Sequence, residues 1–139
     1  GLAGLRLGMA FGSPELIGYL NKIKPPYNIS EATQRHALAA LHDAPRVEAL
    51  RRQLLLGRDW LRERLPALPI VAEVFPSAAN FLLVRFHSDA TAVYDFLVAR
   101  GIIVRNRTTQ PGCAGTLRLT VGTPAENEQL LRALREFAE

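Results

Sequence analysis

The second half of the chain is built from short apolar runs bounded by proline, glycine or polar residues. The four runs are IVAEVF, NFLLVRF, GIIVR and LRLTVG, at residues 70–75, 80–86, 101–105 and 117–122. Runs of this length and flanking are typical of β-strands. Residues 88–100, between the second and third runs, have a helical pattern, with Ser88 expected as the N-cap and Gly101 as the C-terminal stop.

The last apolar run leads into a second helix. Thr123 and Glu126 have the spacing of a capping box, and Pro124 falls at the first helical position. Leu130, Leu134 and Phe137 then follow at helical spacing and are expected on its buried face. The order strand, strand, helix, strand, strand, helix predicts a small mixed sheet with helices packed on it, and so an α/β fold.

The first half of the chain has the pattern of helices rather than of a sheet. Ser13 and Ser30 are expected to cap two helices, and the prolines of KPPYNIS separate them. The helical pattern continues from Glu31 to about Leu65, and Pro45 is expected to split or kink it. Its apolar stripe consists of Val47, Leu50, Leu54 and Leu61. A helix pair of this length, polar on its other face, is a candidate connector between domains.

The stretch LRLGMAF, at residues 5–11, is expected to form a short buried strand. A strand, a short helix and a Pro-Pro turn cannot bury their own apolar faces, so we expect this part to be the edge of a larger domain. The predicted organisation is therefore an incomplete domain edge at 1–29, connector helices at 30–66 and a small α/β domain at 67–139.

Composition narrows the classes of protein. The 139 residues are 48% hydrophobic, which is enough for one ordinary core. The sequence contains no run of about 18 apolar residues, so no membrane-spanning helix is expected. A lone cysteine, Cys113, excludes an internal disulfide and a cysteine-based metal site, and a cytoplasmic location is expected. The net charge of +4 rests mainly on arginines, but these are scattered among acidic residues, which disfavours nucleic-acid binding.

Three arginines stand in positions that suit an anion site. Arg118 lies within an apolar strand, where a charge must be paired or must face a ligand, unless it points outward from a half-exposed strand. Arg105 follows another apolar run, where an ordinary solvated loop residue is the alternative. Arg6 lies among glycines, which allow close approach of the backbone to a ligand, although a salt bridge at a strand end is the alternative.

Other polar residues have simpler explanations. Asn80 is more often a turn former than a ligand-orienting group, and Tyr27 is expected to pack in its turn. The three histidines are expected at the surface. No arrangement of carboxylates, histidines or nucleophiles with catalytic or metal-ligand spacing stands out.

Taken together and in order, five segments resemble a known enzyme family. The segments are GLAGLRLG, KPPYNIS, SAANFLLVRF, GIIVRNRTTQPG and TLRLTVGTPAEN. They are similar to segments of the pyridoxal-phosphate-dependent aminotransferases of fold type I, and most similar to the histidinol-phosphate aminotransferases. The resemblance covers essentially the whole chain, which would correspond to the C-terminal part of that fold.

The resemblance implies specific roles for the three arginines. Arg6 matches the arginine that contacts the phosphate of pyridoxal 5'-phosphate. Arg118 matches the arginine that holds the substrate α-carboxylate and helps to hold the substrate phosphate, and Arg105 matches the second arginine of that phosphate site. The family often has aspartate where this chain has Asn106.

The resemblance also implies what the chain lacks. The lysine that forms the Schiff base would lie upstream of Gly1, so the chain contains no catalytic residue and is expected to be inactive alone. The complete enzyme would be a homodimer that converts imidazole-acetol phosphate and glutamate to histidinol phosphate and 2-oxoglutarate.

Two alternatives remain open. The chain could derive from another aminotransferase, for aromatic or a broad range of amino acids, or from a threonine-phosphate decarboxylase. It could also be a non-catalytic anion-binding module. An upstream reading frame that encodes a Ser-Lys motif would favour the enzyme over the module.

Overall fold

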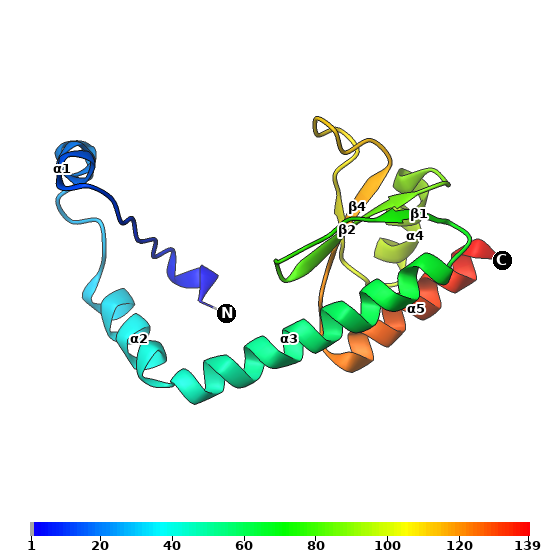
Figure 1. Ribbon diagram of the computed structural model, residues 1–139, viewed down its shortest axis with the longest axis horizontal. Helices are drawn as coiled ribbons and strands as arrows, with labels where there is room; N and C mark the ends of the chain where they lie inside the picture. The colour runs from blue at the N-terminus through cyan, green and yellow to red at the C-terminus, as the bar shows by residue number, and fades with distance from the viewer. Residues whose placement is uncertain (1) are drawn as a thin grey trace. The chain divides into compact units, whose positions relative to one another are not determined.

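The computed structural model describes residues 2–139, and the contacts within the chain divide it into two units (Figure 1). The first unit ends at Ala49 and the second is Leu50–Glu139. The helices are α1 (Pro14–Ile23), α2 (Glu31–His42), α3 (Ala44–Arg64), α4 (Ala90–Ala99) and α5 (Pro124–Ala138). The strands are β1 (Val71–Val74), β2 (Phe81–Phe86), β3 (Arg105–Asn106) and β4 (Thr116–Thr120).

The first unit contains α1, α2 and the start of α3, and none of its described residues is buried. The predicted caps are confirmed: the Ser13 hydroxyl accepts a hydrogen bond from Leu16 N, and the Ser30 hydroxyl accepts one from Thr33 N. The helix break that Pro45 predicts is also confirmed, since α2 ends at His42. The Met9 and Phe11 side chains are 74% and 89% exposed, so this segment does not bury its own apolar residues.

The strand expected in LRLGMAF is absent from the structure. Ala3–Leu5 form a 3-10 helix, and Arg6 closes it in the left-handed conformation, with φ 52°. A strand exists only through hydrogen bonds to a neighbouring strand, and no described residue pairs with this stretch. An apolar run without a partner therefore stays irregular.

In the second unit, the sheet has the strand order β1-β2-β4-β3, and all three pairings are antiparallel. The α/β class and the element order are as predicted. The expected mixture of parallel and antiparallel strands is wrong, because β2 and β4 pair directly with each other and both edge strands join in the antiparallel sense.

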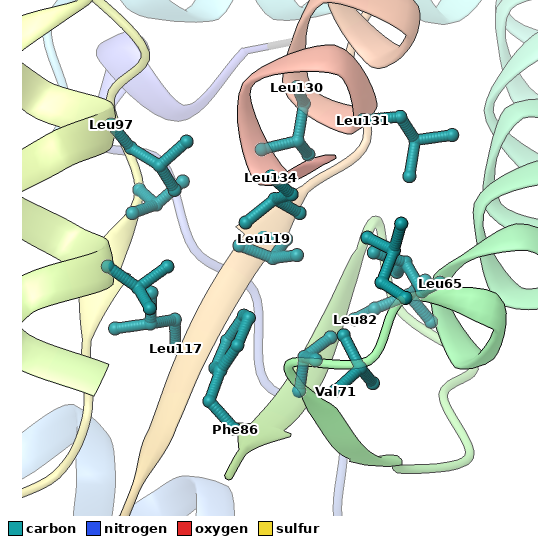
Figure 2. Close-up of a cluster of buried hydrophobic side chains, with 14 of the residues drawn as sticks. Leu65, Val71, Leu82, Phe86, Leu97, Leu117, Leu119, Leu130, Leu131 and Leu134 are labelled. Atoms are coloured by element: carbon teal, nitrogen blue, oxygen red, sulfur yellow. The ribbon is translucent and has the colours of Figure 1, made fainter. Parts of the chain in front are cut away.

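One face of this sheet carries the hydrophobic core. Figure 2 shows Leu82 and Phe86 of β2 and Leu117 and Leu119 of β4 facing side chains of the surrounding helices. The helix residues of the cluster include Leu61 of α3, Leu97 of α4, and Leu130 and Leu134 of α5, all 4% exposed or less. The buried face predicted for the last helix is confirmed, with Phe137 partly buried against the same core.

The C-terminal part of α3 packs closely beside α5 (Figure 1). At Gly57, a side-chain Cβ would lie 3.0 Å from Val121 Cγ1 and 3.1 Å from Asn127 Nδ2, so glycine allows this approach. Asn127 is itself buried, and its amide exchanges two hydrogen bonds with the backbone of Gly122. The polar group of Asn127 is thereby satisfied within the core.

Two local predictions need correction. Helix α4 is capped by Asp89 rather than Ser88: the Asp89 carboxylate accepts a hydrogen bond from Thr91 N at 2.9 Å. Serine and aspartate are both good N-caps, and the helix starts one residue later than expected. Gly101 ends the helix as predicted, with φ 74°.

The run GIIVR forms a strand only at its last residue. Gly101 N and Ile102 N donate to the carbonyls of Val98 and Leu97, the bonding pattern of a Schellman motif. The backbone is therefore still occupied with closing α4, and pairing with β4 begins at Arg105. The buried Val104 contributes to the core without belonging to a strand.

Within residues 2–139, no helix is long and apolar enough to cross a membrane. In the same residues, no group of three or more histidine, cysteine, aspartate or glutamate side chains is placed to hold a metal ion.

The capping box of α5 makes stability depend on pH. Hydrogen bonds from the Thr123 backbone and hydroxyl to the Glu126 carboxylate hold the pKa of Glu126 below its ordinary value of 4.5. A lowered folded-state pKa stabilises the fold above the unfolded-state pKa, and this stabilisation is lost as the pH falls through the folded-state value. We expect Glu126→Gln to lower the midpoint of urea unfolding at pH 7, and the difference from wild type to shrink at pH 3.

Glu128→Gln, an exposed position on the same helix, serves as the control and should change little at either pH. An equal loss of stability in Glu126→Gln at both pH values would contradict the role of the ionised carboxylate.

Candidate anion-binding site

The face of the sheet opposite the core carries most of its charged side chains. Along β4, the fully buried Leu117 and Leu119 alternate with Arg118, which is half-buried. Along β2, the buried positions alternate with the half-buried Phe81, Leu83 and Arg85. Because successive side chains of a strand point to opposite faces, these intermediate residues share the second face.

Arg105 and Arg118 lie directly opposite each other on this second face. In the pairing of β3 with β4, Arg105 is the Cα partner of Arg118, and Arg118 is in turn the partner of Leu83 on β2. Opposite residues of an antiparallel pair have Cβ atoms about 4.5–5.5 Å apart, and like charges there are destabilising. The structure thus brings together two of the three arginines that the sequence indicates.

The Arg118 side chain is held against the sheet but is not electrically paired. Its guanidinium carbon lies 5.1 Å from the centre of the Phe81 ring, a cation–π geometry. Its Nε is buried and has no hydrogen-bond partner. A buried guanidinium donor without an acceptor is unfavourable, and a ligand with acceptor oxygens would satisfy it.

Arg105, Arg118 and Leu83 form one row of side chains across this face, and a second row crosses the face next to it. Arg85 is the partner of Glu73 on one side and of Thr116 on the other. Arg107 N donates to the Thr116 carbonyl at 3.0 Å, which extends the pairing of β3 and β4 by one residue. The row therefore runs Glu73, Arg85, Thr116, Arg107 from one edge of the sheet to the other.

Arg85 fixes the loop that joins β3 to β4. Its Nη1 donates to the Glu73 carboxylate at 2.9 Å, and its Nε and Nη2 donate to the carbonyls of Ala114 and Gly112 at 3.3 and 3.4 Å. The guanidinium also lies 4.8 Å from the centre of the Phe75 ring. These contacts hold the loop to β2 and so maintain the register that sets Arg105 opposite Arg118.

The two rows have an excess of positive charge. They contain four arginines and one carboxylate, and that carboxylate, of Glu73, is already paired with Arg85. Within residues 2–139, Arg105, Arg107 and Arg118 make no ion pair. Arginine's planar fork suits carboxylate and phosphate, so the chemistry of this face is that of binding an anion.

Arg6 belongs to the first unit. It is exposed, and its backbone has the left-handed conformation. No atom lies within 4 Å of the Cβ positions that Gly4 and Gly8 lack, so the backbone around Arg6 is open to a ligand. The structure does not bring Arg6 together with the other two arginines in one unit.

The remaining polar candidates have local structural roles or none. The Asn80 carbonyl accepts a hydrogen bond from Val121 N. Tyr27 is 99% exposed rather than packed in its turn, and Cys113 lies in the loop before β4. Neither Arg85 nor Arg107 stands out in the sequence. The one available signal is that Arg107 follows Arg105 by two residues, the spacing of side chains on the same face of a strand.

The opposed charges lead to a direct test on the chain itself. We expect Arg105→Gln to raise the free energy of unfolding by about 0.2–1 kcal/mol at low salt, because it removes a like-charge pair across the strands. The gain should diminish in 0.5 M NaCl, which screens the repulsion. Urea unfolding measures both values, with Arg132→Gln on an exposed position of α5 as the control; a loss of stability at low salt would contradict the repulsion.

Comparison with known proteins places the chain in a family. The family model described as "Aminotransferase class I and II" matches residues 1–134. A histidinol-phosphate aminotransferase of Parabacteroides distasonis is 49% identical over 137 residues, which are 99% of this chain and 39% of that protein.

Solved structures agree with this assignment. A putative aminotransferase from Burkholderia pseudomallei is 35% identical and has a TM-score of 0.85, covering 100% of this chain and 42% of that one. A histidinol-phosphate aminotransferase from Sinorhizobium meliloti, in complex with pyridoxal-5'-phosphate, is 27% identical with a TM-score of 0.86, covering 99% and 38%. The chain thus spans about two fifths of the length of these relatives, and it belongs to the class I and II aminotransferase family.

Proposed function

We propose that the chain is the C-terminal part of a histidinol-phosphate aminotransferase, which transfers an amino group from glutamate to imidazole-acetol phosphate. The observation that carries this proposal is the pair of unpaired, directly opposed arginines, Arg105 and Arg118, on the exposed side of the sheet. The high identity to proteins that bear this name supports the choice of substrate. The proposed domain organisation is that of the sequence analysis, with residues 67–139 as the small domain.

The two arginines suit both substrates of this reaction. Glutamate presents a carboxylate, and the phosphorylated amino alcohol presents a phosphate of higher charge, so one site must accept two different anions. Arg118 is oriented by the Phe81 ring and has a free buried donor, which fits a group that binds in both half-reactions. Arg105 is exposed on the edge strand, which fits a residue that adds a second contact to the phosphate.

Arg6 fits one part of a pyridoxal 5'-phosphate site. Its guanidinium is exposed, makes no ion pair within residues 2–139, and lies among glycines whose missing side chains leave space for an anion. We propose that Arg6 holds the cofactor phosphate. The bound cofactor would supply the electron sink that amino transfer needs.

The lysine that anchors this cofactor is not among the lysines of the chain. Lys22 lies 5.2 Å from the centre of the Tyr19 ring in the last turn of α1, and Lys24 is the C-cap of the same helix. Neither matches the anchoring position, so we expect the 139 residues alone to be inactive. The complete enzyme is proposed to be a cytoplasmic homodimer with small-molecule substrates.

The substrate assignment is tested in the complete protein that carries this chain. Arg105→Ala should raise the KM for the phosphorylated substrate about tenfold, which is the lower end of the effect expected for losing a charge-assisted hydrogen bond. The effect on the KM for glutamate should be smaller. Steady-state kinetics with each substrate varied in turn gives both values, and Arg132→Gln is the control. An unchanged KM for the phosphorylated substrate would favour an aminotransferase for unphosphorylated amino acids.

The cofactor assignment has its own test, because Arg6 adopts a backbone conformation that glycine prefers. Arg6→Gly therefore removes the guanidinium without straining the backbone, and should weaken binding of pyridoxal 5'-phosphate about tenfold. Absorbance titration of the cofactor-free complete protein measures the affinity. Arg6→Lys should retain part of it; full affinity in Arg6→Gly would exclude the phosphate contact.

A further inference from the structure

Arg107 shares the anion-binding face with Arg105 and Arg118. It lies two residues beyond Arg105, one residue past the end of β3, and its backbone N–H still bonds to β4. We infer from the alternation of side chains that Arg107 falls on the same side of the sheet as Arg105, about 7 Å along the chain. Its hydrogen bond to the Thr116 carbonyl shows that the pairing with β4 reaches this residue. Arg107 and Arg118 are therefore diagonal neighbours, within the reach of two long side chains.

The backbone on both sides of Arg107 is fixed by local hydrogen bonds. The Asn106 carboxamide oxygen accepts from Thr108 N at 2.9 Å and from the Thr108 hydroxyl at 2.6 Å. The Asn106 amide donates to the Thr91 hydroxyl of α4 at 3.3 Å, which ties this turn to the helix layer. The Arg107 carbonyl accepts from Gln110 N at 2.9 Å. Arg107 is thus held in place without using its own side chain.

The Arg107 guanidinium has no partner within residues 2–139, although the residue is only half-exposed. The one carboxylate in its row, Glu73, lies at the opposite edge and is paired with Arg85. A salt bridge within the described chain therefore does not explain this residue. A fixed backbone with an unpaired cation beside two other unpaired cations is the arrangement of a binding site.

The number of arginines indicates the charge of the ligand. A carboxylate has one negative charge and two oxygens, which one or two arginines satisfy. A phosphate monoester has a charge of about −1.5 to −2 at neutral pH and three acceptor oxygens. Two arginines on adjacent strands and a third directly after one of these strands match the phosphate and exceed what a carboxylate requires.

We propose that Arg107 is a third substrate-binding arginine, one that contacts the substrate phosphate and favours phosphorylated over carboxylate substrates. This inference rests on the proposed function, because it assigns the phosphate to the site formed by Arg105 and Arg118. It adds a specificity-determining residue: Arg118 serves both substrates, whereas Arg107 acts only when a phosphate is bound.

The experiment compares Arg107→Gln, Arg107→Lys and Arg105→Ala in the complete protein, with Arg132→Gln as the control. KM and kcat are measured with histidinol phosphate and, separately, with glutamate. Arg107→Gln should raise the KM for histidinol phosphate about tenfold and leave the KM for glutamate and kcat within about twofold. Arg107→Lys should recover part of the loss, since it keeps the charge but not the planar fork.

The outcomes separate this inference from the function on which it rests. If Arg105→Ala raises the KM for histidinol phosphate and Arg107→Gln does not, the third arginine is refuted and the proposed function stands. If neither variant changes that KM, the phosphate site itself is refuted. If Arg107→Gln changes both KM values equally, or lowers the melting temperature together with kcat, the side chain is structural and the inference fails.

Discussion

The alternation of side chains along β4 is the constraint on which the site depends. Leu117 and Leu119 are fully buried between the sheet and its helices, and this burial leaves only one orientation for the residue between them. Arg118 must then point to the other face, where its guanidinium lies over the Phe81 ring. A slip of the strand by one residue would bury the arginine and expose both leucines, so the energy of the hydrophobic core is also what positions the cation.

The same constraint accounts for the crowding of positive charge. Once β4 is placed by its core side, antiparallel pairing sets Arg105 of the edge strand opposite Arg118, and the hydrogen bond from Arg107 N to Thr116 continues this pairing one residue past the strand. The sheet gains nothing from this arrangement by itself, because like charges on neighbouring strands repel. The Arg85–Glu73 ion pair and the carbonyl contacts of Arg85 hold the loop that keeps the strands in register. These contacts hold the strands in register without a bound anion, which is what the proposed site requires.

Most predictions that depend on neighbouring residues in sequence were accurate, although Asp89 rather than Ser88 caps α4. Two of the predictions that failed concern apolar runs expected to pair as full strands. The caps by Ser13, Ser30 and Thr123 are contacts with the residue three positions further along the chain, and the structure confirms them. The run LRLGMAF is largely apolar, like β2, yet it has no partner among the described residues and forms no strand. Gly101 and Ile102 are likewise taken up by the C-cap of α4, a competition that the apolar pattern alone does not reveal.

The sequence by itself determined the local elements, the α/β order of the second unit and the arginines suited to anions, because periodicity, caps and charge are properties of short segments. Only the tertiary structure decided that Arg105 stands opposite Arg118, that Arg107 joins them, and that Glu73 is already paired with Arg85. These relations follow from strand order and register, which are set by the packing of leucines far apart in the chain. A pattern can mark a residue as a candidate, but the register determines which neighbours it has.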